Sequence, residues 1–154
     1  MTQFRQILAP TDFSDRSRRA VGFAADEARR CGGTLHLLHV VSSGTIGHPM
    51  DVAVAIPASQ DLMADAQRLL LKLPEGDTQS TSPDAPDLGV LRRVQQGQPD
   101  LLILDYAREH QIDLIVLATH ARSGVQRLLL GSTAESVLRH SPCPLLVVPP
   151  TGND

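Results

Sequence analysis

Short apolar runs and longer amphipathic segments alternate along the whole chain. The apolar runs are bounded by Gly, Pro, Asp or Ser, a pattern typical of strands in a sheet that is covered on both faces. The run at Val90–Val94 is the weakest, and we expect it at a sheet edge. Strands are predicted at Ile7–Ala9, Thr34–Val41, Val90–Val94, Asp113–Ala118 and Pro144–Val148.

The segments between these runs carry apolar residues at helical spacing. The first helix is expected to begin at a cap provided by Ser14 or Asp12, to turn Arg16 and its other arginines outward, and to end at Gly32. The third is expected to begin near Pro99, because proline suits the first turn. The second and fourth are predicted over Ala58–Leu73 and Thr133–His140.

Two segments interrupt the pattern. Gly44–Pro57 is punctuated by Gly and Pro and is expected to be a mobile loop, while Pro74–Asp87 is rich in Pro, Asp, Ser and Thr and predicts no fixed structure. Neither side of Pro74–Asp87 can bury a core alone, so residues 1–154 are expected to form a single domain. The order βαβαβαβαβ predicts an α/β fold, with an open five-stranded parallel sheet, helices on both faces and right-handed crossovers.

Composition excludes several classes of function. The formal net charge of −3 gives no basis for binding nucleic acid or a membrane surface through bulk electrostatics. Lys72 is the only lysine, so the Gly-Lys-Ser/Thr signature of phosphate-loop kinases and ATPases is missing. Cys31 and Cys143 have no CxxC partner and are expected to be reduced thiols. With no signal-peptide pattern and no apolar run approaching about 20 residues, the chain is expected to be cytoplasmic.

A ligand site is predicted where the strand order reverses. In a sheet of order 3-2-1-4-5 the first and fourth strands are neighbours, and ligands of open parallel sheets bind outside the carboxyl ends of such strands. Those ends carry Pro10-Thr11-Asp12 and Ala118-Thr119-His120-Ala121, and Gly131-Ser132-Thr133 begins the fourth helix on the same side.

These residue types suit a nucleotide. Asp12 can accept hydrogen bonds from ribose hydroxyls, Val40 can flank a base, and Ser132 with the N–H groups of a helix N-terminus can hold phosphates. Arg122 or Arg127 can add positive charge, and His120 is either a phosphate contact or a structural contact of its loop. Two structural alternatives stay open: Asp12 caps the first helix, and Ser132-Thr133-Ala134-Glu135 is a capping box that needs no ligand.

Other candidate chemistry is weaker. His36 and His39 are separated by an odd number of positions on a strand, so they face opposite sides and cannot share one metal ion. The Gly-x-Ser-x-Gly signature of serine hydrolases is absent. We predict no catalytic residues and no metal ligands, so at most weak ATP hydrolysis is expected.

The chain resembles the universal stress protein (UspA) family over nearly its whole length. The resemblance is carried by Ile-Leu-Ala-Pro-Thr-Asp-Phe-Ser at Ile7–Ser14, by His-Leu-Leu-His-Val-Val at His36–Val41 and by Leu114–Pro149. It implies a Rossmann-like fold of the adenine nucleotide alpha hydrolase type. It also implies a regulatory or sensor protein of the stress response that binds ATP or another adenine nucleotide, with or without Mg²⁺. A homodimer paired through Leu145–Val148 and an unidentified regulatory protein partner complete what the resemblance implies.

In the nucleotide-binding branch of that family a Gly-x2-Gly-x9-Gly-Ser/Thr motif holds the phosphates, and here this frame falls on Ala118, Ala121, Gly131 and Ser132. The resemblance places the end of the first strand and Val40 around adenosine, and the motif frame with Thr133 along the phosphates. The complete predicted site comprises Pro10, Thr11, Asp12, Val40, Leu117, Ala118, His120, Ala121, Arg122, Gly131, Ser132 and Thr133.

Alanine at two glycine positions leaves two outcomes open. Glycine permits a positive φ and a close approach of phosphate to the backbone, whereas alanine at a left-handed position costs on the order of 1 kcal/mol. If both positions keep a negative φ, the methyl groups are nearly neutral and ATP can bind. If they close the phosphate site, the chain is a nucleotide-independent dimeric interaction module of the same fold. A slow ATPase is the third alternative.

Overall fold

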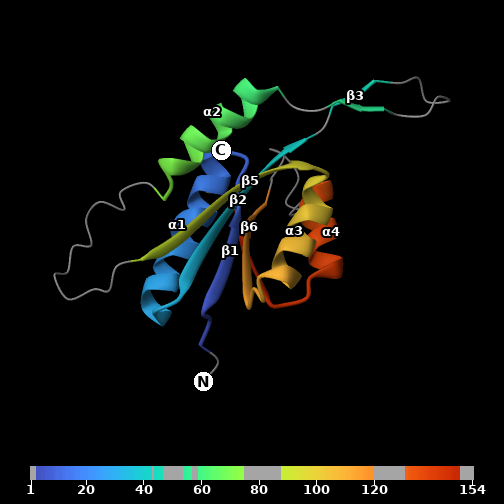
Figure 1. Ribbon diagram of the computed structural model, residues 1–154. Helices are drawn as coiled ribbons and strands as arrows, with labels where there is room; N and C mark the ends of the chain where they lie inside the picture. Colours follow the sequence, from blue (N-terminus) through green and yellow to red (C-terminus); the bar gives the residue numbers. More distant parts are fainter. Residues whose placement is uncertain are drawn as a thin grey trace.

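The computed structural model describes residues 3–42, 44–46, 54–56, 59–74, 88–119 and 131–149. Strands and helices alternate over most of these residues, as the hydrophobic pattern predicts (Figure 1). The elements are β1 (Gln6–Pro10), α1 (Asp15–Cys31), β2 (Thr34–Ser42), β3 (Gly44–Ile46), β4 (Val54–Ile56), α2 (Gln60–Leu71), β5 (Gly89–Gly97), α3 (Pro99–Glu109), β6 (Leu114–Ala118), α4 (Ser132–His140) and β7 (Leu145–Val148).

Five strands form the main sheet in the order β5-β2-β1-β6-β7, and every neighbouring pair is parallel. This confirms the predicted α/β class and the order 3-2-1-4-5, counted over the five predicted strands. β1 lies between β2 and β6, so the chain reverses its direction of travel across the sheet at the β1–β6 pair. β5 is an edge strand, as expected from its weak apolar pattern.

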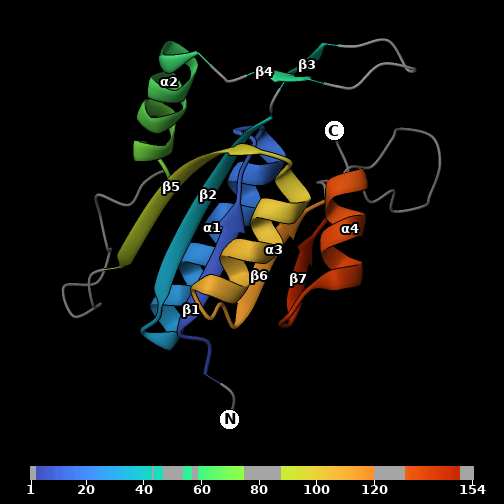
Figure 2. The same ribbon diagram turned by 45° about the vertical axis from the view of Figure 1, so that its right-hand side comes forward.

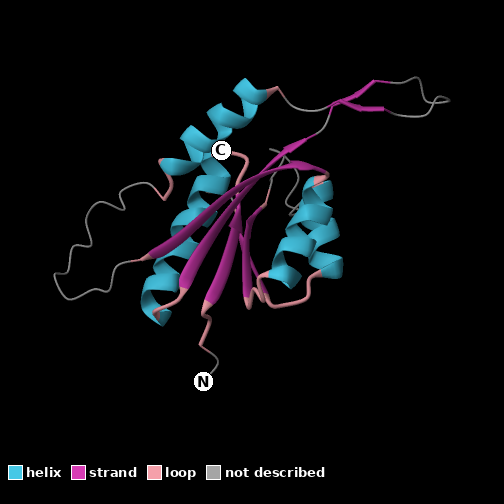
Figure 3. Cartoon of the chain, viewed as in Figure 1, coloured by secondary structure: helices cyan, strands magenta, loops and turns pink. Residues whose placement is uncertain are grey.

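Helices cover both faces of the sheet, α1 and α2 on one and α3 and α4 on the other (Figures 2 and 3). Alternate residues of each buried strand therefore enter different cores. In β1, Ile7 and Ala9 pack with the alanines of α1, whereas Leu8 packs with Tyr106 of α3 and Val137 of α4. Both faces of the central strands are thus apolar, which explains their continuous hydrophobic runs.

Local hydrogen bonds set the helix ends. Ser14, not Asp12, is the N-cap of α1, and its Oγ accepts from the N–H of Ser17 at 3.3 Å. α1 ends at Gly32, which takes the left-handed conformation with φ 62°. At the end of α2, Arg92 of β5 donates to the carbonyl of Leu73 from Nε at 3.1 Å and Nη2 at 2.7 Å. No helix in the described part of the chain combines the length and the apolar character needed to cross a membrane.

The prediction of a loop over Gly44–Pro57 is wrong in part. Gly44–Ile46 and Val54–Ile56 pair as an antiparallel hairpin, β3–β4, which the interpretation missed because it weighted Gly and Pro above the short β-branched runs. The rest of that segment, and Pro74–Asp87 apart from Pro74, lie outside the described residues. α2 is also shorter than predicted, because it begins after the Ser59 cap and ends at Leu71.

Candidate functional site

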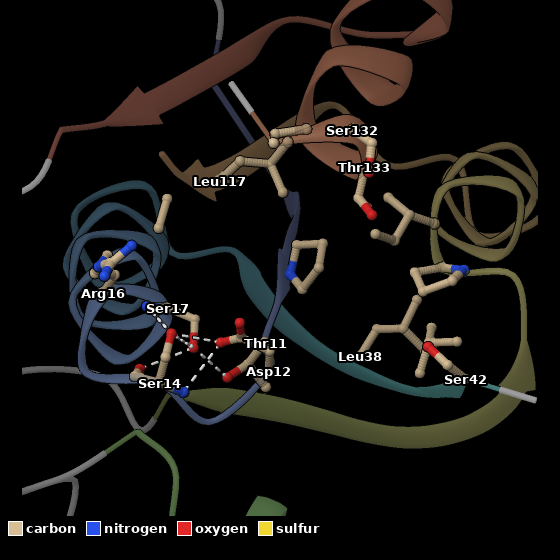
Figure 4. A pocket seen from close by; sticks show the side chains of 17 residues that line it. Thr11, Asp12, Ser14, Arg16, Ser17, Leu38, Ser42, Leu117, Ser132 and Thr133 are labelled. Carbon is tan, nitrogen blue, oxygen red and sulfur yellow. Dashed lines mark hydrogen bonds between the residues drawn. The ribbon is translucent and has the colours of Figure 1, made fainter. Parts of the chain in front are cut away.

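A cavity of about 300 Å³ opens at the carboxyl ends of β1, β2 and β6, where the strand order reverses (Figure 4). The N-terminal turns of α1, α3 and α4 also border it. Three helix N-termini therefore face one cavity, and their dipoles favour an anion there. That of α4 has no side-chain cap from the residues that the structure describes, whereas the Ser17 N–H of α1 is capped by Ser14 and α3 begins with a proline that has no N–H. The lining residues are Pro10, Thr11, Asp12, Ser14, Arg16, Ser17, Leu38, Val40, Ser42, Pro99, Ile103, Leu117, Ala118, Gly131, Ser132, Thr133 and Ala134.

One side of the cavity is apolar. Leu38 and Val40 of β2 face it from the sheet, and Pro99 and Ile103 of α3 face it from the helix layer. Ser42, the last residue of β2, adds a hydroxyl at the outer end of this wall (Figure 4). A slot with apolar walls and few polar groups is the usual environment of a flat aromatic ligand.

The opposite side is a network of small polar residues at the start of α1 (Figure 4). Asp12 Oδ1 accepts from the N–H of Ser14 at 3.0 Å, and Ser14 Oγ also donates to it. Behind this pair, Thr11 Oγ1 and Ser17 Oγ lie 2.9 Å apart in a buried contact. The network holds the Asp12 carboxylate at the mouth of the cavity while Asp12 itself stays exposed.

Hydrogen bonding keeps Asp12 ionised. Partial burial raises the pKa of this carboxyl group, but the hydrogen bonds from Ser14 and Ser17 outweigh that effect and leave the pKa below its ordinary value. The group is therefore a carboxylate at neutral pH, able to accept hydrogen bonds and repelling any anion placed directly against it.

The turn that carries Asp12 contains a strained residue. Phe13 has φ 64°, a left-handed conformation that is rare for a bulky side chain. Its ring lies 4.3 Å from the ring of His39 on the α1 face of the sheet, and its N–H donates to Thr11 Oγ1 at 3.0 Å. These contacts hold Phe13 on the α1 face, away from the cavity that Asp12 lines.

The N-terminus of α4 carries no side-chain cap among the described residues. Its N-cap is Gly131, and Ser132 is the first helical residue. The capping-box interpretation of Ser132–Glu135 is therefore wrong, because the helix begins one residue earlier than Thr133. Glu135 instead accepts a hydrogen bond from Arg139 Nη2 at 2.8 Å. The first N–H groups of α4 and the hydroxyls of Ser132 and Thr133 are left facing the cavity.

Arg16 does not lie on the outer face of α1, as its position among the arginines of that helix suggested. It lines the cavity. The physical reason is its place in the first turn, because helical side chains lean toward the N-terminus and a first-turn residue therefore reaches past the end of the helix. Arg16 is the only basic side chain that the described residues contribute to the cavity lining.

Nine of the twelve predicted site residues line this one cavity: Pro10, Thr11, Asp12, Val40, Leu117, Ala118, Gly131, Ser132 and Thr133. The other three, His120, Ala121 and Arg122, lie outside the described residues, as does Arg127. Ala118 belongs to β6 and is not among the described residues with positive φ, so its methyl group creates no left-handed strain.

Several lining residues were not predicted, although the sequence pattern indicated some of them. Leu38 and Ser42 lie two positions from Val40 on the same strand and thus share its face. Pro99 and Ile103 required knowing that α3 begins at the same edge of the sheet as α4. For Ser14 the sequence indicated only helix capping, and Ser17 was not predicted to have a role.

The two strand histidines are structural, and they lie on opposite faces as predicted. His36 is 2% exposed; its Nε2 lies 2.6 Å from Gln6 Oε1 and its Nδ1 lies 3.0 Å from the hydroxyl of Tyr106. A neutral imidazole protonated on Nε2 satisfies both contacts. His39 Nδ1 lies 2.8 Å from the carbonyl oxygen of Thr11. Within the described ranges, no group of three or more metal-ligating side chains is close enough together to hold an ion.

Comparisons with known proteins agree with this fold. Universal stress protein MJ0531 of Methanocaldococcus jannaschii is 31% identical over 148 residues, which cover 94% of this chain and 82% of that protein. The structure of UspA from Lactobacillus plantarum has a TM-score of 0.68 at 27% identity and covers 96% of this chain and 99% of its own.

Two solved structures with the same fold carry adenine nucleotides. A universal stress protein in complex with cAMP has a TM-score of 0.65 at 22% identity and covers 96% of this chain and 98% of its own. The universal stress protein from Archaeoglobus fulgidus in complex with dAMP has a TM-score of 0.65 at 20% identity and covers 95% of this chain and 98% of its own. At such identities these two structures show a shared fold. The sequence profile of the Universal stress protein family matches residues 3–149, and the chain therefore belongs to that family.

Proposed function

We propose that this chain binds an adenine nucleotide, ATP in the first instance, in the cavity above β1 and β6, and that it acts as a regulatory protein of the stress response. The observation that carries the proposal is the composition of that one cavity. It joins an apolar slot, an ionised carboxylate and an uncapped helix N-terminus in a continuous surface. These three environments suit, in order, a base, a ribose and a phosphate.

Several further facts support the proposal. Two structural neighbours are complexes with cAMP and with dAMP, which share an adenine base. Ala118 lies in an extended strand and does not have a positive φ, so the backbone strain that alanine would bring at a left-handed position does not arise there. The cavity that Ala118 lines has a volume of about 300 Å³, so the pocket itself is open.

Titration calorimetry with ATP, AMP and cAMP tests the proposal. We expect saturable binding of ATP at one site per chain, and a gain in unfolding free energy of about 2.7 kcal/mol when ATP is at about 100 times its Kd. Ala118→Ile is expected to abolish binding, since a β-branched side chain suits β6 but fills the cavity. Absence of both heat and thermal stabilisation in the wild type at millimolar nucleotide would rule the proposal out.

We further propose that the chain forms a homodimer through β7. This strand is at the edge of the sheet, where one row of its backbone N–H and C=O groups is left for pairing with another chain. Leu146 of β7 is 40% exposed, so an apolar side chain accompanies the open edge. A symmetric pairing of two β7 strands satisfies both features.

Leu146→Arg is expected to convert the dimer into a monomer, because two copies of the new charge meet across the symmetry axis. Light scattering coupled to size exclusion measures the change in mass. Leu91→Arg is the matched control, since Leu91 is 50% exposed on the opposite edge strand, β5. A wild-type mass of one chain at all concentrations, or dissociation by Leu91→Arg but not by Leu146→Arg, would refute pairing through β7.

A further inference from the structure

We infer that Arg16 binds the terminal phosphates of the nucleotide and thereby makes the site selective for ATP over AMP. This inference rests on the proposed function and adds to it a residue and a ligand preference. The starting observation is that Arg16 lines the same cavity as Asp12, Ala118 and Ser132.

The layout of the cavity fixes the direction of the ligand. The apolar slot of Leu38, Val40, Pro99 and Ile103 takes the base, on the side of β2 and α3. Asp12 follows at the end of β1, where its carboxylate can accept from ribose hydroxyls. From there a phosphate chain has to move away from Asp12, because two negative groups in contact repel each other.

Beyond the ribose, the cavity runs over the end of β6. Leu117 and Ala118 form its floor there, and the N-terminus of α4 borders it with Ser132 and Thr133. In Figure 4, Arg16 lies on the other side of Leu117 from Ser132 and Thr133. α1 packs directly against β6, which places the first turn of α1 beside the same strand end.

The charges around the cavity indicate which phosphates Arg16 binds. The α4 N-terminus offers N–H groups and two hydroxyls but only a partial positive charge, which suits the first phosphate. The β- and γ-phosphates bring the greatest negative charge to the cavity, and Arg16 is the only full positive charge that the described residues place on its lining. A guanidinium presents five N–H donors in a rigid fork and binds two phosphate oxygens at once. AMP, with one phosphate, ends before it reaches this group.

The experiment compares ATP, AMP and adenosine by calorimetry on wild type and Arg16→Gln at one ionic strength. Loss of a charge-assisted contact is expected to weaken ATP binding roughly 10- to 100-fold, while AMP and adenosine change less than about threefold. Arg16→Lys is expected to restore part of the ATP affinity, because it returns the charge without the fork. Arg30→Gln is the matched control: it removes the same charge from the far end of α1, where Arg30 pairs with Glu27 at 2.6 Å on the surface.

The outcomes separate the two proposals. If wild type binds ATP and the ratio of ATP to AMP affinity is the same in Arg16→Gln, the role of Arg16 is wrong and the nucleotide site stands. If Arg30→Gln lowers ATP affinity as much as Arg16→Gln does, the effect is one of overall charge, and the specific contact is again wrong. If wild type binds none of the three ligands, the nucleotide site itself is wrong. Thermal unfolding of each variant verifies that the fold is retained.

Discussion

Lowering the pH from about 6.5 to about 4 is expected to remove about 3 kcal/mol of unfolding free energy through His36 alone. Burial at 2% exposure and the neighbouring His110 lower the pKa of His36 to about 4, while Asp113 acts in the opposite direction. In the unfolded chain the same imidazole titrates near its ordinary value of 6.5. Between these two pH values the imidazole is protonated in the unfolded state and neutral in the folded state. The free energy of unfolding therefore falls as the pH falls, and the contribution of His36 is fully present above pH 6.5.

The hydrogen bonds of His36 fit a neutral imidazole. Nδ1 accepts from the Tyr106 hydroxyl and Nε2 donates to Gln6, so a proton added to Nδ1 requires the Tyr106 hydroxyl to change from donor to acceptor. The ring of Tyr106 stacks on His110 with centroids 3.8 Å apart, and the His110 ring lies 5.8 Å from that of His36.

Urea unfolding at a series of pH values, on wild type and on His36→Gln, measures the effect. The variant is expected to be less stable than wild type at neutral pH. It is also expected to lack the loss of unfolding free energy between pH 6.5 and 4, so the two curves of stability against pH converge on acidification. Parallel curves would show that His36 does not titrate in this way. An NMR titration of the wild-type imidazole reads its pKa directly and does not depend on how well the variant folds.

Asp12→Asn is expected to weaken ATP binding roughly 10- to 100-fold. This is the second of the two largest effects that we expect. The carboxylate is held ionised at the cavity mouth by Ser14, so it is ready to accept from the 2′- and 3′-hydroxyls of a ribose. Asparagine keeps an oxygen acceptor for the Ser14 N–H but replaces one carboxylate oxygen by a donor group. The turn is thus preserved while the charge and half of the acceptor capacity are lost.

A ligand without ribose hydroxyls makes this test specific. Wild type is expected to bind ATP more tightly than 2′,3′-dideoxy-ATP, and Asp12→Asn is expected to bind both equally. Asp15→Asn is the matched control. This substitution removes the same charge from the first turn of α1, but Asp15 does not line the cavity. A variant at position 12 that keeps the preference for ATP would show that Asp12 does not contact the ribose.

The fold was largely predictable because its main signals are local. Buried parallel strands require continuous apolar runs, and amphipathic helices require a periodic stripe, so alternation along the chain indicated the sheet and its helices. The β3–β4 hairpin was missed because three-residue strands carry almost no periodicity. The exact start of α4 was also missed. Gly131 and Ser132 are both acceptable caps, and only the backbone conformation shows which residue begins the helix.

The candidate site was predictable in outline. The end of a strand is visible in sequence, and strand ends at a reversal of strand order converge on one edge of the sheet, which brought together Asp12, Leu117 and Ser132. The side chains that complete the cavity come from helix turns, whose direction depends on packing. Arg16 was assigned to the solvent face, yet the first turn of α1 directs it into the cavity.

By itself, the amino-acid sequence determined the alternating α/β order, the edge position of β5 and the strand ends that carry the polar residues, since each depends on neighbours along the chain. Only the tertiary structure decided that Ser14 caps α1 and leaves Asp12 at the cavity mouth, that Ala118 keeps a negative φ, and that Arg16 lines the cavity. These three features depend on which elements pack together. Packing is set by contacts between residues far apart in the chain, and no local pattern records them.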